Sequence, residues 1–126
     1  MARLVVLLAV ATCVAPIALD TGAASSADDP RIASAWRVLC IVECARCHGK
    51  SYEGLAAPSI VRYAGTQNRE MFVRMVLEGD PPRGMPGYRS NAYVVESIDD
   101  IYRYFLARAK GDIGPDYRAP MPVERQ

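Results

Sequence analysis

Histidine is almost absent from this 126-residue sequence, which contains a single one, His48. The scarcity excludes a second histidine ligand from this chain at any metal centre, and it removes the side chain that most often serves as acid or base near neutral pH. An excess of charge of one sign is also lacking, because 15 basic and 14 acidic residues leave a net charge of +1. This balance argues against nucleic acid as a partner.

The sequence also lacks an apolar run long enough to cross a membrane. The apolar stretch that follows Arg3 ends near Leu19, short of the ~20 residues that a spanning helix needs. Small residues at 25–27 then offer a cleavage site, so we predict that residues 1–27 are a signal peptide and that the mature protein is periplasmic without stable membrane insertion. Retention of the leader as an anchor is the alternative.

Cleavage after Ala27 would leave 126 − 27 = 99 residues, enough for one domain with a thin side-chain core. We predict a domain over residues 28–111 and an extended tail over residues 112–126, which contains three prolines. Something other than side chains is expected to fill the centre of so small a domain.

Patterns typical of strands are nearly missing, and helical periodicity dominates what remains. Apolar residues at helical spacing predict helices over residues 30–47 and 69–78, and a third that starts near Ser97 and closes at Gly111. Glycine and proline predict loops over residues 49–65 and 80–88. The expected fold class is all-α, with three main helices.

Individual positions support these boundaries. Pro30 suits the first turn of a helix, Asn68 suits an N-cap, and Gly79 suits a helix end. Trp36 falls on the apolar face of the first helix, so we predict that it belongs to the core. Cys40, one turn before the next cysteine, is predicted to be a small buried hydrophobe.

The segment Cys44-Ala45-Arg46-Cys47-His48 has the C-x-x-C-H pattern of covalent haem attachment. Two thiols three residues apart share one helical face, so both can reach the vinyl groups on one side of a porphyrin and form thioethers. The adjacent imidazole can then bind the iron. We therefore predict one covalent haem c, held by Cys44 and Cys47, with His48 as a metal ligand.

Three alternatives compete with haem attachment for this motif. A thioredoxin-like redox pair would need a strand before the motif and a sheet around it. A zinc site could recruit Cys40 with the two motif cysteines and His48, but these ligands are all local. The third alternative is a coincidental pair of buried cysteines.

The sixth iron ligand is predicted to be Met85, because methionine is the common partner of histidine in cytochromes c. Met85 stands between Gly84 and Pro86 in a stiff loop that can hold a sulfur at a fixed height. Three other methionines follow the leader. Two of them share a helix and are predicted to pack, and the last lies in the tail: Met71, Met75 and Met121.

With the iron occupied on both faces, no open position remains for a substrate. Electron transfer follows as the predicted function, and we expect no enzymatic activity. Two alternatives stay open: a haem subunit bound tightly to a dehydrogenase complex, and a haem c enzyme or ligand-binding protein whose sixth site can open.

The chain resembles class I cytochrome c over roughly residues 30–110, through the C-x-x-C-H motif, Gly84-Met85-Pro86 and the aromatic final helix. The resemblance implies that the first and last helices cross near Trp36 and either Tyr102 or Phe105. It also implies that Pro58 lies beside the His48 ring, where a backbone carbonyl receives the imidazole proton. Further candidate haem-pocket contacts are Arg62, Tyr63 and Tyr88.

More narrowly, residues 72–79, 84–88 and 101–109 are similar to small periplasmic cytochromes that accept electrons from quinoprotein alcohol dehydrogenases. This similarity implies redox proteins as partners, with a periplasmic dehydrogenase as donor and an oxidase or another cytochrome as acceptor. We expect the protein to be a monomer.

Overall fold

The computed structural model describes residues 25–121, so most of the predicted leader and the last five residues lie outside the described residues. The chain forms helices in the order η1 (Ser26–Asp28), α1 (Pro30–Ile41), α2 (Ala45–His48), α3 (Ile60–Thr66), α4 (Arg69–Glu78), η2 (Pro81–Arg83) and α5 (Ala92–Lys110). Between residues 25 and 121 the only β-type pairing is an isolated bridge of Asp80 with Met85. The predicted all-α fold class is confirmed.

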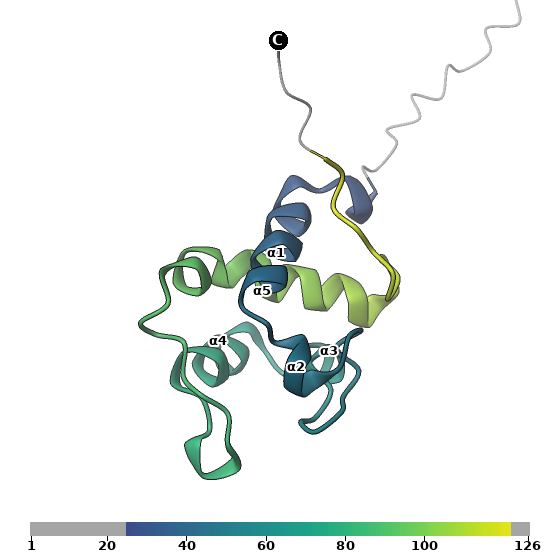
Figure 1. The fold of residues 1–126 in the computed structure, drawn as a ribbon. Helices are drawn as coiled ribbons and strands as arrows, with labels where there is room; N and C mark the ends of the chain where they lie inside the picture. Colours follow the sequence, from purple (N-terminus) through teal and green to yellow (C-terminus); the bar gives the residue numbers. More distant parts are fainter. Residues whose placement is uncertain (1–24, 122–126) are drawn as a thin grey trace, which may run out of the picture.

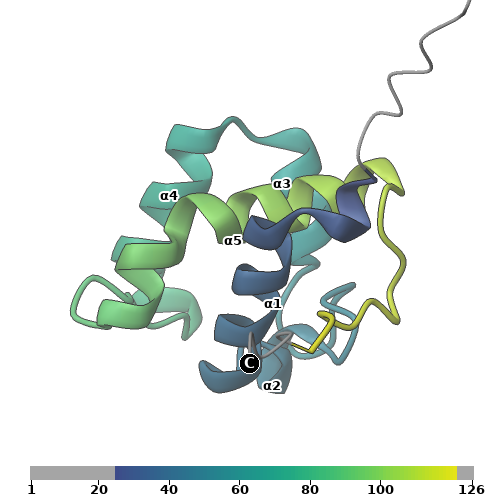
Figure 2. The ribbon, with the colours of Figure 1, turned by 90° about the horizontal axis from the view of Figure 1, so that it is seen from above.

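Helix α5 is the element around which the others pack. Helix α1 crosses it in both views, and α3 and α4 pack against it as well (Figures 1 and 2). None of the helices within residues 25–121 combines the length and the apolar character needed to traverse a bilayer.

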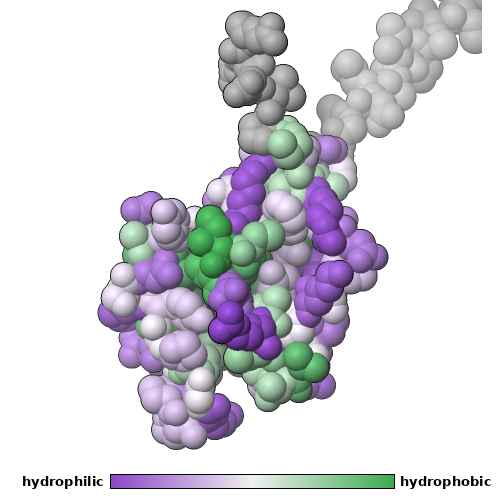
Figure 3. All heavy atoms as spheres, in the orientation of Figure 1, coloured by the Kyte–Doolittle hydropathy of each residue, from purple (hydrophilic) through white to green (hydrophobic). Residues whose placement is uncertain are grey.

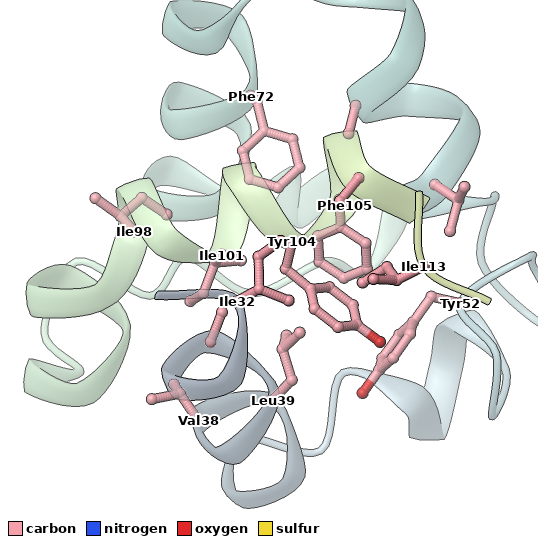
Figure 4. Packing of buried hydrophobic residues seen from close by; sticks show 14 of the residues in the cluster. Ile32, Val38, Leu39, Tyr52, Phe72, Ile98, Ile101, Tyr104, Phe105 and Ile113 are labelled. Carbon is pink, nitrogen blue, oxygen red and sulfur yellow. The ribbon is translucent and has the colours of Figure 1, made fainter. Parts of the chain in front are cut away.

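The core lies mainly where α1 meets α5. Figure 4 shows Ile32 and Leu39 of α1 pointing toward α5, where Ile101 and Tyr104 face them. Phe105 is 1% exposed and extends the same cluster toward Phe72 of α4 and Tyr52 of the loop after α2. The crossing therefore uses Ile101 and Tyr104 on α5. Tyr102 packs instead against Phe72 of α4, and its hydroxyl donates to the Gln67 carbonyl.

The segment after α5 returns toward the start of the domain (Figure 1). The Tyr117 hydroxyl donates to the carbonyl oxygen of Ala27 at 3.2 Å, and the Arg37 guanidinium donates to that of Pro120 at 2.7 Å. Ile113 is buried in the core. Residues 112–121 are thus irregular but fixed to the helices by side-chain contacts.

The predicted continuous helix over residues 30–47 is wrong in its second half. Helix α1 ends at Ile41, and Glu43 adopts a φ of +54°, which is outside the helical region. The chain resumes a helical turn at Cys44, which precedes α2. The two motif cysteines therefore lie on a separate turn, displaced from the axis of α1.

Other boundaries also differ from the prediction. Helix α4 is confirmed with its Asn68 cap, but the predicted loop over residues 49–65 is wrong in its last part, where α3 begins at Ile60. Helix α5 is capped by Asn91 and begins five residues before the predicted start at Ser97. Its end at Gly111 is confirmed.

Two packing predictions in α1 fail because that face of the helix lies at a surface groove. Cys40 is exposed, and Trp36 is only partly buried. Both line an open groove of 640 Å³ that also involves α2 and the C-terminal segment. Trp36 therefore packs on the margin of the core.

Candidate haem site

The thiols of Cys44 and Cys47 lie on one helical turn. Cys44 has helical angles (φ −52°, ψ −31°), and its carbonyl accepts the backbone N–H of His48 at 3.1 Å. Both thiols are free, with Cys44 half-buried and Cys47 exposed. Burial raises the pKa of the Cys44 thiol. The turn thus offers two unpaired sulfurs, three residues apart, on one face.

The imidazole of His48 is oriented by a backbone group. Its Nδ1 lies 2.6 Å from the carbonyl oxygen of Pro58, which fits donation of the Nδ1 proton to that oxygen. The contact fixes the plane of the ring and leaves Nε2 free as a metal ligand.

The loop that carries Pro58 folds back onto the motif turn. The backbone N–H of Gly54 donates to the His48 carbonyl at 2.8 Å, and that of Ala57 donates to the Cys47 carbonyl at 2.9 Å. Gly49 has a φ of +84°, and a Cβ there would lie 2.9 Å from the Gly54 oxygen. A side chain at that position would therefore push the loop away from His48.

The segment that presents Met85 is held against the end of α4. Asp80 and Met85 exchange backbone hydrogen bonds of 2.9 and 3.1 Å, which close the turn that contains η2. The N–H groups of Tyr88 and Arg89 donate to carbonyls in the last turns of α4, each at 3.1 Å. Half-buried Met85 is thus carried on a loop anchored at both ends.

A cavity of 310 Å³ lies along α3 and α4. It is lined by Tyr63, Met71, Arg74, Met75, Glu78 and Gly79. Arg62, the other candidate on α3, is exposed and is not part of this lining. The prediction that Met71 and Met75 fill the core is wrong, since both are half-buried at the cavity.

Arg74 is a cavity residue that the sequence-based predictions did not include. Its guanidinium lies 3.2 Å from the sulfur of Met71, one turn earlier on the same helix. The signal available in the sequence was its spacing, because a residue three positions after Met71 shares that face of α4.

Tyr88 belongs to the loop after η2, and its partly buried ring packs against the core. Burial raises the pKa of its hydroxyl, and the negative charge of Cys44 and Cys47 in their thiolate form raises it further. Figure 3 shows apolar surface over the end of α1 and around α2. A notch in the surface separates this region from the protruding part of the molecule that contains η2.

These residues fit a haem better than the competing groups. Within residues 25–121 no set of three or more histidine, cysteine or acidic side chains is placed to hold a metal ion, which contradicts the zinc alternative. The same residues contain no sheet, which contradicts the thioredoxin-like alternative. An oriented imidazole directly after two free thiols on one turn fits the covalent attachment of a haem and one ligand to its iron.

Comparison with known proteins agrees with this chemistry. The family that matches residues 31–105 is described as cytochrome c oxidase, cbb3-type, subunit III. Cytochrome c-555 of Methylococcus capsulatus is 35% identical over 71 residues, which cover 56% of this chain and 56% of that protein. The crystal structure of the c-type cytochrome XoxG from Methylobacterium extorquens AM1 superposes with a TM-score of 0.63 at 27% identity.

The superposition on XoxG covers 70% of this chain and 56% of that one, so the chain spans a little over half the length of each of these relatives. The matched region contains the motif turn and most of the helices. The chain belongs to this family of cytochrome c domains, has the class I cytochrome c fold, and has a covalent haem c as its cofactor.

Proposed function

We propose that this protein is a periplasmic electron-transfer protein and not an enzyme. Cys44 and Cys47 would hold the haem through thioether links, and His48 and Met85 would be the ligands of its iron. The bound haem supplies one-electron exchange between Fe(II) and Fe(III). The observation that carries the proposal is the His48 Nδ1 contact with the Pro58 carbonyl at 2.6 Å, directly after two free thiols on the same turn.

The chain's own residues set the properties of the site. The Pro58 carbonyl holds the imidazole in the tautomer that leaves Nε2 available and strengthens it as a donor. The hydrogen-bonded turn from Asp80 to Met85 limits the movement of the sulfur ligand, which favours one ligation state over an open sixth position.

The haem pocket is proposed to include three further candidates from the sequence and one from the structure. Tyr63 and Arg74 line the cavity beside α3 and α4, where a basic group suits a propionate. Tyr88 is proposed as a contact near the thioether links, because the Cys44 and Cys47 sulfurs influence the pKa of its hydroxyl. Arg62 is exposed and is proposed only as a contact at the rim.

Covalent attachment is tested first. Protein matured in a periplasm should show a low-spin c-type spectrum, and its colour should survive acid–acetone extraction because thioethers do not dissociate. Replacement of either Cys44 or Cys47 by alanine should leave a single link. A colourless protein with free thiols in the mass spectrum would end the proposal.

Met85→Ala should lower the reduction potential, because the thioether sulfur favours Fe(II) relative to stronger donors. The weak sulfur-to-iron absorption band at the red end of the spectrum should disappear. Met75→Leu is the matched control, since Met75 lines the neighbouring cavity on α4. A band that survives in Met85→Ala but is lost in the control would reassign the ligand.

The proposed donor is a periplasmic dehydrogenase, specifically a quinoprotein alcohol dehydrogenase, and the proposed acceptor is an oxidase or another cytochrome. Support comes from the resemblance of residues 72–79 and 84–88 to cytochromes that serve such enzymes. Rapid mixing of the oxidised protein with a reduced quinoprotein dehydrogenase should give fast haem reduction. A rate no faster than with an unrelated reduced protein would contradict this donor.

The second candidate is a haem subunit that stays bound to a larger complex, which the description of the matching family favours. Gel filtration of the periplasmic fraction distinguishes the two. A monomer at moderate salt supports the carrier, and co-elution with a partner supports the subunit. Carbon monoxide binding to the untreated ferrous protein would instead indicate a sixth site that opens.

A further inference from the structure

Helix α5 contains a buried cation that the proposed electron-transfer role does not explain. The side chain of Arg108 is only 2% exposed. One of its terminal nitrogens, Nη2, donates to the carbonyl oxygen of Ser51 and to Oε1 of Glu53, both at 3.0 Å. The other, Nη1, is buried and has no partner within residues 25–121. Burial of a guanidinium is costly, so the position calls for a reason.

The two acceptors of Arg108 flank a residue in an unusual conformation. Tyr52, between Ser51 and Glu53, has a φ of +63°, which a non-glycine residue adopts only when its surroundings impose it. Its ring is buried edge-on against Phe105, with the ring centres 5.2 Å apart. Arg108 therefore grips the chain on both sides of a strained residue.

The strained residue organises the part of the loop that reaches His48. The Tyr52 carbonyl accepts the backbone N–H of Ile60 at 3.0 Å and the hydroxyl of Ser59 at 3.3 Å. Those two residues directly follow Pro58, whose carbonyl accepts from the imidazole. A continuous set of contacts thus runs from Arg108 on α5 to the ring of His48.

We propose that Arg108 is a positioning residue for the axial histidine. By fixing Ser51 and Glu53 around Tyr52, it holds the Pro58 carbonyl against His48 Nδ1 and so maintains the orientation and donor strength of the imidazole. This inference rests on the proposed role of His48 as an iron ligand. It differs from a purely structural role, in which Arg108 would only add to the stability of the whole domain.

Hydrogen exchange of the His48 Nδ1–H, measured by NMR on the ferrous holoprotein, separates the two roles. In Arg108→Met this proton should exchange at least about tenfold faster than in the wild type. The amides of the α1–α5 core should accelerate much less. Arg103→Met is the matched control, because Arg103 is a half-exposed arginine of the same helix whose nearest acid, Asp29, is 3.7 Å away.

Uniform acceleration of all amides and of the ring proton in Arg108→Met, or no acceleration of the ring proton, would overturn the inference. If Arg108→Met does not fold, Arg108→Lys replaces it, because lysine keeps the charge but cannot reproduce the geometry of the two hydrogen bonds. Exchange of the His48 ring proton should still be selectively faster in this variant. The proposed function fails separately, if the wild-type holoprotein lacks a haem-shifted signal of the His48 ring.

Discussion

Two glycines with positive φ flank η2, and they differ in what surrounds them. Gly79 has a φ of +71° and a ψ of −165°, and a Cβ there would lie 2.5 Å from the carbonyl carbon of Pro86 and 2.6 Å from the oxygen of Met85. Gly84 has a φ of +83°, but a Cβ there would meet no atom within 4 Å. The first glycine therefore permits a close approach of two backbones, and the second only a turn.

We expect Gly79→Ala to displace the loop that carries Met85. The backbone strain alone costs about 1–3 kcal/mol, and the overlap adds to it. Unfolding by denaturant should show this loss, and the sulfur-to-iron band should weaken in the folded protein. Gly84→Ala should cost about 1–2 kcal/mol with the band retained, because its strain is local. Equal spectra for the two variants would argue against a ligand role for Met85.

At the level of elements, α3 shows how a short helix is tied to the site. The hydroxyl of its N-cap, Ser59, accepts the backbone N–H of Arg62 at 3.0 Å and is buried beside the Tyr52 carbonyl. The cap of α4, Asn68, makes the same kind of bond to the N–H of Met71 at 2.9 Å, but at an exposed position. The two caps thus make the same kind of bond at the start of their helices. Only Ser59 lies next to Pro58 in the sequence.

Asn68→Ala should lower the free energy of unfolding by about 1 kcal/mol, the usual cost of removing such a cap. Ser59→Ala should cost more, because the Ser59 hydroxyl also donates to the buried Tyr52 carbonyl. Only Ser59→Ala should also change the reduction potential, because Ser59 follows the carbonyl that orients His48. Denaturant unfolding and potentiometric titration of both variants provide the measurements. A potential altered equally in both would mean that the effect is global.

The extent to which these elements could be predicted depended on length and on local strain. Helix α4 has ten residues, a clear cap and a glycine end, and its boundaries followed from the sequence. Helix α3 has seven residues among glycines and prolines, too few to show periodicity, although Ser59 and the apolar Ile60 and Val61 were a usable signal. The break before α2 depends on Glu43 at a φ of +54°, which its residue type does not predict.

The residues of the candidate site also differ in how far the sequence predicts them. The motif spacing indicated the thiols and His48, since their chemistry depends on neighbours in the sequence. Arg74 could have been identified from its spacing, because it lies three positions after Met71 on the same helix, whereas the buried Arg108 could not, because its role depends on a contact with Ser51. The contact of Arg108 with Ser51 joins residues that are 57 apart along the chain, so it can be found only once the fold is known.

On the scale of the whole molecule, aromatic rings connect parts that are far apart in sequence. The ring centre of Phe105 lies 5.2 Å from those of Tyr52 and Tyr104 and 6.1 Å from that of Phe72. These partners belong to the loop after α2, to α5 itself and to α4. Phe105 is thereby in contact with the loop that holds Pro58 and with the helix that anchors the Met85 segment.

Phe105→Ala should therefore destabilise the domain by about 3–5 kcal/mol, the range for removing a buried phenyl ring. This is a large share of the roughly 5–15 kcal/mol that stabilises a typical domain. The midpoint of denaturant unfolding should fall, with both the far-ultraviolet and the haem signals moving together, because one ring supports both halves of the site. Leu106→Ala, next to it but only half-buried, should cost less. The contrary result would be a far-ultraviolet signal that is lost at lower denaturant while the haem signal still changes at the wild-type midpoint. The loop with Pro58 and the Met85 segment would then not depend on Phe105.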